Sequence, residues 1–186
     1  MQKYLLRSWL PVAVAGTIIM FSMYAVVQQS IRLNANDPQI QIAQDGSLAL
    51  SGSTSPRDFV GTMRIDMHAS LAPFVIVYDD SNKVLASSGL LNGEVPVLPT
   101  GVFDYTRKNI EDRITWQPAS TTRVAAVVRY FHGANNGFIV VGRNLREIEK
   151  REHQFGLMVG AAWVGLLVLT FMASTSAWIV ERKETL

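Results

Sequence analysis

The chain contains no cysteine among its 186 residues. Disulfides, thiolate metal sites, iron–sulfur centres and cysteine nucleophiles are therefore excluded. The chain also has no block of lysine and arginine residues interleaved with aromatics, and its formal net charge is only +2. Because nucleic-acid binding requires a concentrated basic surface, the sequence predicts no nucleic-acid partner.

Motifs of catalysis and metal binding are missing as well. Ser87-Ser88-Gly89 lacks the G-x-S-x-G pattern of a nucleophile elbow, and no glycine-rich loop with a lysine is present to cradle phosphate. Residues 79–82 lack the glycine and distal glutamate of a calcium loop, which favours a plain turn. The three histidines share no metal-ligand spacing: His68, His132 and His153. We therefore expect no enzyme activity, no cofactor and no metal site.

Long apolar runs are the strongest feature that is present. Phe155–Val180 carries no charge, and a second run covers Trp9–Val27. About 20 apolar residues in a helix span the hydrocarbon core of a bilayer, so both runs predict transmembrane helices. A buried helix of a soluble protein is the alternative for the later run. A cleaved signal peptide is the alternative for the earlier one, although it lacks a clear A-x-A site.

Basic residues at both short ends predict the orientation of these helices. Lys3 and Arg7 precede the first run, and Arg182 and Lys183 follow the second. Short basic segments remain on the cytoplasmic side of a membrane, so both termini are expected there. The expected organisation is residues 1–28 as the N-terminus and first helix, 29–152 as one extracytoplasmic domain, 153–180 as the second helix and 181–186 as a tail.

Two helix starts are predicted within the central domain. At Asn36-Asp37-Pro38, we expect a helix to break and restart, with Asp37 as N-cap and Pro38 in the first position. Ser55 and Pro56 have the same arrangement, and apolar residues recur at three and four from Phe59 to Leu71. This spacing predicts an amphipathic helix that ends before Pro73.

Strand patterns follow from Phe74 onward. A short apolar run at 74–78 predicts a strand that is covered on both faces, and an antiparallel partner is expected at 83–88. Residues 89–101 are rich in glycine and proline and predict an irregular connector. Alternating residues and an Asn-Asn-Gly turn predict three more strands, at 113–117, 123–131 and 138–141. Asn144 is expected to cap a last helix that continues into the second apolar run.

This order of elements resembles the extracytoplasmic PAS-like (single Cache, or PDC) sensor domains of bacterial membrane receptors. The resemblance is carried by 74–79 (FVIVYD) with 83–88 (KVLASS), and by 137–143 (GFIVVGR) leading into a helix. It implies an α+β fold with a five-stranded antiparallel sheet, placed in a bacterial inner membrane. Family members carry a signalling module after the second helix, whereas only six residues follow Val180 here. We therefore expect another membrane protein to read any signal.

The resemblance also implies a ligand pocket between the sheet and the 89–101 connector. Arg129 stands out because a cation in an apolar strand requires an anionic partner when buried, and a small acidic ligand would supply one. The alternative is an arginine at a sheet edge, solvated or paired with Glu111 or Asp112. Trp116 also fits a plain core position. The candidate pocket residues are Tyr78, Ser87, Trp116, Arg129 and Tyr130.

Small residues in the second apolar run suggest helix packing. Gly156 and Gly160 are four apart, as are Ala161 and Gly165. Small residues let helix backbones approach in lipid, either within one chain or between two. A homodimer would extend its seam through Leu145 and Ile148. An ordinary glycine-rich span explains the same residues.

Two functions remain open from the sequence. The first is a membrane-anchored sensor that binds a small ligand or a partner and transmits through its transmembrane helices. The second is an accessory subunit of a membrane complex without a small ligand. A polar-lined pocket favours the first, and an apolar core filling that space favours the second.

Overall fold

The computed structural model describes residues 2–34 and 37–184. The chain divides into two compact units. One unit comprises the two ends of the chain, up to Ile31 and from Lys150 onward. The other, which we call the lobe, comprises residues Arg32–Glu149.

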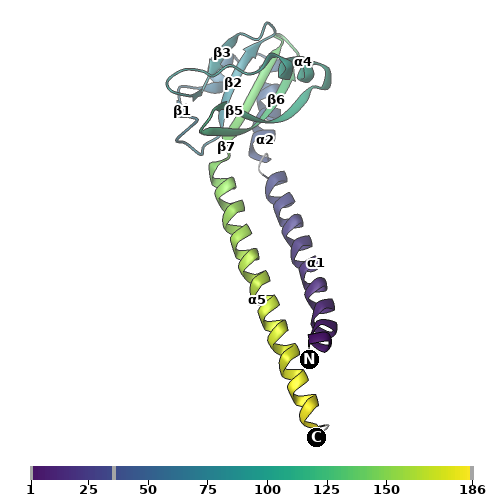
Figure 1. The fold of residues 1–186 in the computed structure, drawn as a ribbon. Coiled ribbons are helices and arrows are strands. Elements are labelled where there is room, and N and C mark those ends of the chain that lie inside the picture. The colour runs from purple at the N-terminus through teal and green to yellow at the C-terminus, as the bar shows by residue number, and fades with distance from the viewer. Residues whose placement is uncertain (1, 35–36, 185–186) are drawn as a thin grey trace. The chain divides into compact units, whose positions relative to one another are not determined.

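Two long helices make up the unit of the chain ends. They are α1 (Gln2–Asn34) and α5 (Arg146–Glu184), of which α5 begins in the lobe (Figure 1). Within them, Arg7–Ile31 and Arg146–Val180 are long and apolar enough to cross a membrane. Both segments are almost unburied, unlike the core helix of a soluble protein. By length and composition, the two helices could span a bilayer.

Two hydrogen bonds from tryptophan side chains connect α1 and α5, one donated from each helix. Trp9 Nε1 donates to Thr170 Oγ1 at 3.1 Å, and Trp163 Nε1 donates to Thr17 Oγ1 at 3.0 Å. Each hydroxyl also donates to a carbonyl one turn earlier in its own helix. In an apolar medium these polar groups have few other partners, so the paired bonds favour association of the two helices.

The lobe is built on a five-stranded antiparallel sheet in the order β3-β2-β7-β6-β5 (Figure 1). This confirms the predicted α+β class and the predicted number of strands. The strands are β2 (Phe74–Asp79), β3 (Val84–Ser87), β5 (Glu111–Ala119), β6 (Thr122–Phe131) and β7 (Gly137–Asn144).

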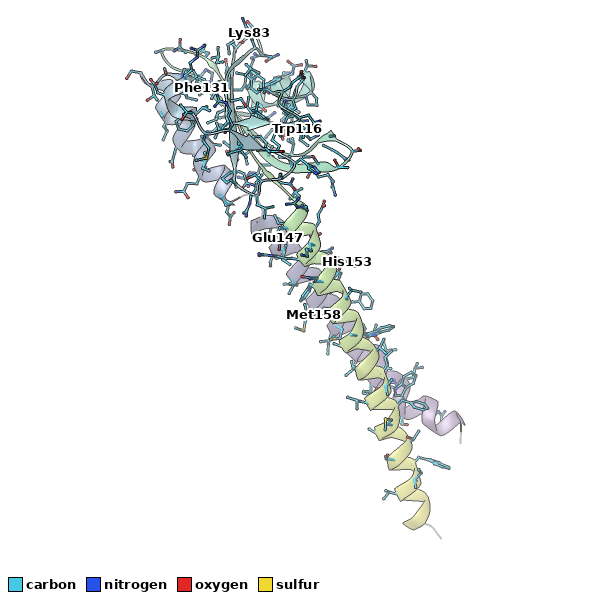
Figure 2. All side chains as sticks on the ribbon, turned by 90° about the vertical axis from the view of Figure 1, so that its left-hand side faces the viewer. Lys83, Trp116, Phe131, Glu147, His153 and Met158 are labelled. Atoms are coloured by element: carbon cyan, nitrogen blue, oxygen red, sulfur yellow. The ribbon has the colours of Figure 1, made fainter. Side chains whose placement is uncertain are left out.

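Both faces of the central strands are buried, as the sequence predicted for residues 74–78. One face, which we call the α4 face, is covered by the connector and helix α4 (Thr100–Asn109). The other, the α2 face, is covered by helix α2 (Asp37–Ser51), which packs across β6 and β7. Alternate residues of β6 divide between the two cores, so Val128 lies on the α4 face and Val127 on the α2 face. This period-two division is the geometry of a strand. In Figure 2, Trp116 and Phe131 lie within the lobe and Lys83 projects from its end.

Helix α2 lies close to the sheet because of a glycine. A Cβ on Gly46 would lie 2.3 Å from Ile139 Cδ1 and 2.6 Å from Phe59 Cζ. A glycine inside a helix costs about 1 kcal/mol relative to alanine, and here the close contact with the sheet explains its presence. The helix begins at Asp37, so Asp37 is its first residue rather than a preceding cap. Residues 35 and 36, where the break was predicted, lie outside the described residues.

Helix α3 spans only Pro56–Val60. Its predicted start is confirmed, since Ser55 Oγ accepts a hydrogen bond from the Asp58 N–H at 3.2 Å. The predicted continuation to Leu71 is wrong. The chain leaves the helix at Gly61, whose φ of +70° is accessible to glycine without steric cost.

The segment after α3 forms a small parallel sheet instead of a helix. β1 (Ile65–Asp66) pairs with β4 (Gly89–Leu90). This pairing places Met67, which is 1 % exposed, in the core of the α4 face. The apolar spacing that predicted a helix thus reflects burial of single residues in an extended segment.

Candidate functional site

The candidate site lies between the sheet and α4, next to the 89–101 connector under which the resemblance implied a pocket. Phe103 of α4 fills the centre of this space and is 2 % exposed. Its ring lies edge-on to Tyr78 of β2 and to Phe138 of β7, with ring centroids 5.0 Å apart in each pair. Leu98 of the connector is buried in the same cluster. An aromatic core therefore occupies much of the predicted pocket.

A buried phenol in this core has no hydrogen-bond partner. Tyr78 is 2 % exposed, and its hydroxyl oxygen contacts no donor or acceptor among the described residues. Burial raises the pKa of Tyr78 to about 12, because the charged form is penalised away from water. The phenol is therefore neutral at physiological pH. An unsatisfied buried hydroxyl costs about 1–3 kcal/mol, which a ligand that accepts its hydrogen bond would recover.

A polar cluster holds α4 against the rim of the sheet. Arg107 Nη2 of α4 donates to the Asp80 backbone carbonyl at 2.7 Å and to Asp80 Oδ1 at 3.2 Å. Tyr130 Oη of β6 donates to the same Oδ1 at 2.9 Å. The Arg107 guanidinium also lies over the Phe138 ring, 5.1 Å from its centroid. We call these contacts the α4 latch.

The charges of the latch are set by its hydrogen bonds. The bond from Tyr130 lowers the pKa of Asp80, and the bond from Arg107 acts in the same direction. Burial raises the pKa of the Tyr130 hydroxyl, and the hydrogen bond to Asp80 raises it further. The latch therefore combines a carboxylate, a guanidinium and a neutral phenol. Both Arg107 and Asp80 are partly exposed, with side-chain exposures of 36 % and 55 %, so an external anion can compete for the arginine.

A hollow of about 620 Å³ lies beside the latch and shares Asp80 with it. Buried Leu50 and Phe131 line it, together with the exposed Arg57. The Arg57 guanidinium has no hydrogen bond or ion pair within the described part of the chain. The hollow is thus lined by a cation and by the Asp80 carboxylate. The other lining residues are Thr54, Ser55, Pro56, Asp79, Ser81, Leu85, Asn135 and Asn136.

Three of the five predicted pocket residues lie together on the α4 face: Tyr78, Trp116 and Tyr130. Ser87 lies on β3, and its hydroxyl donates to the Gly89 carbonyl at 2.7 Å. Arg129 lies elsewhere, because alternation along β6 turns its side chain to the α2 face. There Arg129 Nη1 contacts Glu111 Oε2 at 2.8 Å, the partner that the sequence analysis gave as the alternative.

Sequence reasoning missed Arg107, Asp80 and Phe103 because it missed α4. The helix has no side-chain N-cap, since Pro99 holds that position. A usable signal was present in the spacing: Thr106 and Arg107 follow Phe103 at three and four residues, so all three share one side of the helix, where Phe103 and Thr106 are buried. This short spacing was hidden by the glycine-rich and proline-rich residues before it.

The histidines make contacts unrelated to a shared site. His68 Nδ1 lies 3.0 Å from Thr122 Oγ1, and the His132 ring lies edge-on to Tyr130 with centroids 4.4 Å apart. His153 lies on α5 (Figure 2). In the described ranges, no group of three histidine, aspartate or glutamate side chains is placed to hold a metal ion.

The junction between β7 and α5 is the second polar cluster of the lobe. Asn144 Oδ1 accepts the Arg146 N–H at 2.8 Å, so its side chain caps the first N–H of α5 as predicted, although Leu145, whose carbonyl accepts the Glu149 N–H, holds the N-cap position. Asn144 Nδ2 donates to the carbonyls of Met67 at 2.8 Å and His68 at 3.2 Å. Arg143 Nε donates to the Leu71 carbonyl at 2.8 Å. The first turn of α5 is thus tied to the segment 67–71, which precedes β2.

The small residues of α5 lie in different settings. A Cβ on Gly156 would lie 3.6 Å from the Tyr24 hydroxyl of α1, so Gly156 faces that helix. A Cβ on Gly160 or Gly165 would meet nothing within 4 Å, and Ala161 is exposed. Gly16 of α1 lies close to α5, since a Cβ there would lie 2.6 Å from Leu166 Cδ2.

The geometry described above can be compared with known proteins. No family model, curated protein or solved structure matches the chain.

Proposed function

We propose that the chain is a membrane-anchored, receptor-like module with a PAS-like lobe on the extracytoplasmic side. Basic residues at both ends support a cytoplasmic location for the termini, and the resemblance to bacterial receptors supports a bacterial inner membrane. The lobe recognises a small acidic ligand or a partner at the α4 latch. It transmits the event through α5 to another membrane protein.

A single strand carries this proposal, because β7 touches both polar clusters. Phe138, its second residue, lies beneath Arg107 of the latch. Asn144, its last residue, caps α5 and holds the segment 67–71. A change at the latch therefore has a direct covalent route of eight residues to the first turn of α5. Such a route gives two sites one shared element, which coupling between sites requires.

The chemistry of the site favours a carboxylate as the ligand. Arg107 presents a guanidinium that already contacts one carboxylate and is partly exposed. A second carboxylate could replace Asp80, since guanidinium groups bind carboxylates strongly. The neutral phenol of Tyr78 would then find an acceptor once α4 moves outward. Replacement of Asp80 would also release its bond to Tyr130.

Hydrogen exchange of the full chain in lipid nanodiscs tests this function. Sodium propionate and sodium benzoate are suitable probes, because both present a carboxylate and differ in apolar size. We expect a probe to change exchange in α4 and also in residues 66–72. Arg107→Gln should abolish both responses. Arg113→Gln is the matched control, because Arg113 is an exposed arginine that contacts Glu111 on β5.

A response confined to α4 would refute the relay, and no response to any carboxylate would refute the proposed ligand. The orientation has its own test, because the chain lacks cysteine. An impermeant maleimide should label Asn135→Cys in intact cells. It should label a cysteine added after Leu186 only once the cells are lysed. Labelling of both in intact cells would refute the topology.

The second candidate is an accessory subunit without a small ligand. One observation favours it, namely that Phe103 and Leu98 fill the space beneath α4. In that case, α4 is a fixed cover and the lobe docks onto a larger membrane complex. Absence of any exchange response to carboxylates, together with one membrane protein recovered after cross-linking in cells, would favour this alternative.

A further inference from the structure

The two edges of the five-stranded sheet differ in how well they are protected. β3 forms one edge and β5 the other. β3 has only four residues, and its pairing with β2 is interrupted by an irregularity at Val77/Tyr78. Short length and bulges are devices that prevent an edge strand from pairing with another chain. The β3 edge is therefore protected against pairing with a strand of another chain.

The β5 edge is longer and more regular. β5 has nine residues, and its register with β6 is uninterrupted from Glu111 to Trp116. No strand pairs with its outer side in the part of the chain that the structure describes. Helix α2 packs on β6 and β7, whereas α4 contacts both β5 and β6 from the α4 face of the sheet. An open edge of this length is a template for a further strand.

The register identifies which backbone groups are open. The Tyr130 N–H donates to the Ile110 carbonyl at 2.8 Å, so alternate residues from Ile110 onward bond to β6. The N–H and C=O groups of Glu111, Arg113 and Thr115 consequently point away from the sheet. They repeat every two residues, which is the spacing of an antiparallel ladder.

We propose that the β5 edge pairs with the β5 edge of a second copy of this chain, antiparallel and centred on Ile114. This register places Arg113 opposite Thr115 of the other copy and Asp112 opposite Trp116. No two like charges then face each other, which matters because such pairs are destabilising.

Other self-pairings are less suitable. Centring on Asp112 or Arg113 would place two like charges directly opposite each other. Centring on Thr115 would pair Arg113 with Gln117, which lies beyond Trp116, where the strand becomes irregular. The register centred on Ile114 pairs residues 112–116 with the same residues of the other copy, and only Glu111 faces Gln117 beyond the regular part. Two-fold symmetry makes one self-complementary strand sufficient for the contact.

Membrane anchoring makes a short contact of this kind sufficient. A pair of strands buries less surface than the roughly 1,200 Å² of a stable soluble complex. Two anchored copies are held at a high effective concentration, so a weak contact is populated. The contact rests on the sheet edge and not on the α4 latch, so it stands or falls independently of the proposed ligand.

Cysteine cross-linking in membranes tests the proposal against a clean background, because the chain has no cysteine. In a non-hydrogen-bonded antiparallel pair, the Cα atoms lie about 4.5 Å apart, within the range of a disulfide. We therefore expect Ile114→Cys in the full chain to form a disulfide-linked dimer on mild oxidation. Ser87→Cys on the β3 edge is the matched control and should remain monomeric.

Two further experiments keep the test decisive if Ile114→Cys disturbs the core. Differently tagged chains carrying Arg113→Cys and Thr115→Cys should cross-link to each other, since both positions lie at the surface. Thr115→Pro removes an N–H that points outward from the β5 edge and leaves the pairing with β6 intact. When it is combined with Ile114→Cys, it should reduce the amount of disulfide-linked dimer at least tenfold. Thr115→Val retains the N–H and should not reduce it.

Three results would overturn the proposal. One is absence of cross-links at both Ile114 and the Arg113/Thr115 pair in folded protein. Another is equal cross-linking of Ser87→Cys, which would indicate random collision in the membrane. The third is an adduct whose mass differs from two copies, which would assign the edge to a different protein.

Discussion

Replacement of Asn144 should loosen the junction between the sheet and α5 more than any other single polar substitution in the lobe. The side chain is 4 % exposed. It uses its oxygen to cap α5 through the Arg146 N–H and its nitrogen to bind the carbonyls of Met67 and His68. Alanine removes all three bonds, whereas serine retains an oxygen that can cap the helix.

The magnitude follows from these contacts. Loss of a helix cap costs about 1 kcal/mol. Loss of donors to buried carbonyls costs a further ~1–3 kcal/mol. Asn144→Ala should therefore destabilise the junction by about 2–4 kcal/mol, and Asn144→Ser by about 1 kcal/mol less. Since 1.4 kcal/mol is tenfold in an equilibrium constant, alanine should raise local opening about 30-fold to 1,000-fold.

Hydrogen exchange of the full chain in nanodiscs measures this opening directly. We expect amides of residues 66–72 and of the first turn of α5 to exchange fastest in Asn144→Ala, more slowly in Asn144→Ser and slowest in the native chain. Asn109→Ala is the control, because Asn109 is exposed and bonds only to the Tyr105 carbonyl of its own helix. If Asn144→Ala left exchange at residues 66–72 within threefold of the native rate, the described junction would not hold that segment.

Three other perturbations have defined outcomes. Because the pKa of Asp80 is lowered in the folded lobe, its bonds in the α4 latch stabilise the lobe fully at pH values above the ordinary carboxyl pKa of 3.8, and this stabilisation is lost as the pH falls through the lower folded pKa. The amides of α4 should therefore exchange faster, relative to the intrinsic rate, at pH 3 than at pH 5. Asp80→Asn should remove the difference. Gly46→Leu should lower the midpoint of unfolding of the lobe by an amount equivalent to about 1–3 kcal/mol, because α2 cannot approach Ile139 with a side chain there; an unchanged midpoint would show that α2 packs differently. Thr17→Val removes the acceptor for the Trp163 N–H and leaves an apolar side chain in its place, so a blue shift of tryptophan emission is expected, whereas Thr62→Val should leave the emission unchanged.

The sheet could be predicted from the sequence because its strands carry local signals. Alternation in β6 assigns Val127 and Val128 to opposite faces without reference to the rest of the fold. The Asn-Asn-Gly pattern marks the connection between β6 and β7, although Gly137 is already the first residue of β7 and none of its three residues has the positive φ of the predicted turn. The cap at Asn144 is equally local, since it requires only a side-chain oxygen and the next turn of helix.

The segments 61–73 and 89–109 could not be predicted in the same way. Their apolar residues are buried by partners distant in the sequence: Met67 by the core of the α4 face and Ile65 by its pairing with Gly89. Periodicity cannot distinguish such isolated burial from a helix face. The short α4 lacks a capping side chain, and tertiary contacts through Phe103 fix its position.

The candidate site shows the same limit. Arg129 could be recognised as an arginine in an apolar strand, but the partner of such a residue depends on register. The register places it opposite Glu111, and this pair satisfies it. Arg107 gave no sequence signal of a binding cation, because its importance comes from a helix that brings it over Phe138. Residue type can suggest candidate site residues, whereas the pairing of strands determines which of these residues lie close together.

In the proposed relay, the segment 67–71 is the part that must change. β7 lies between β2 and β6 and is bonded on both sides, so sliding it would break two ladders at once. Packed interiors of this kind switch between discrete arrangements and do not deform gradually. The bonds from Arg143 and Asn144 to segment 67–71 are few and can exchange without disturbing the sheet. A signal from the latch would therefore reach α5 as a release of segment 67–71 and a change in the capping bond of α5. In this relay β7 moves together with the rest of the sheet and does not slide against its neighbours.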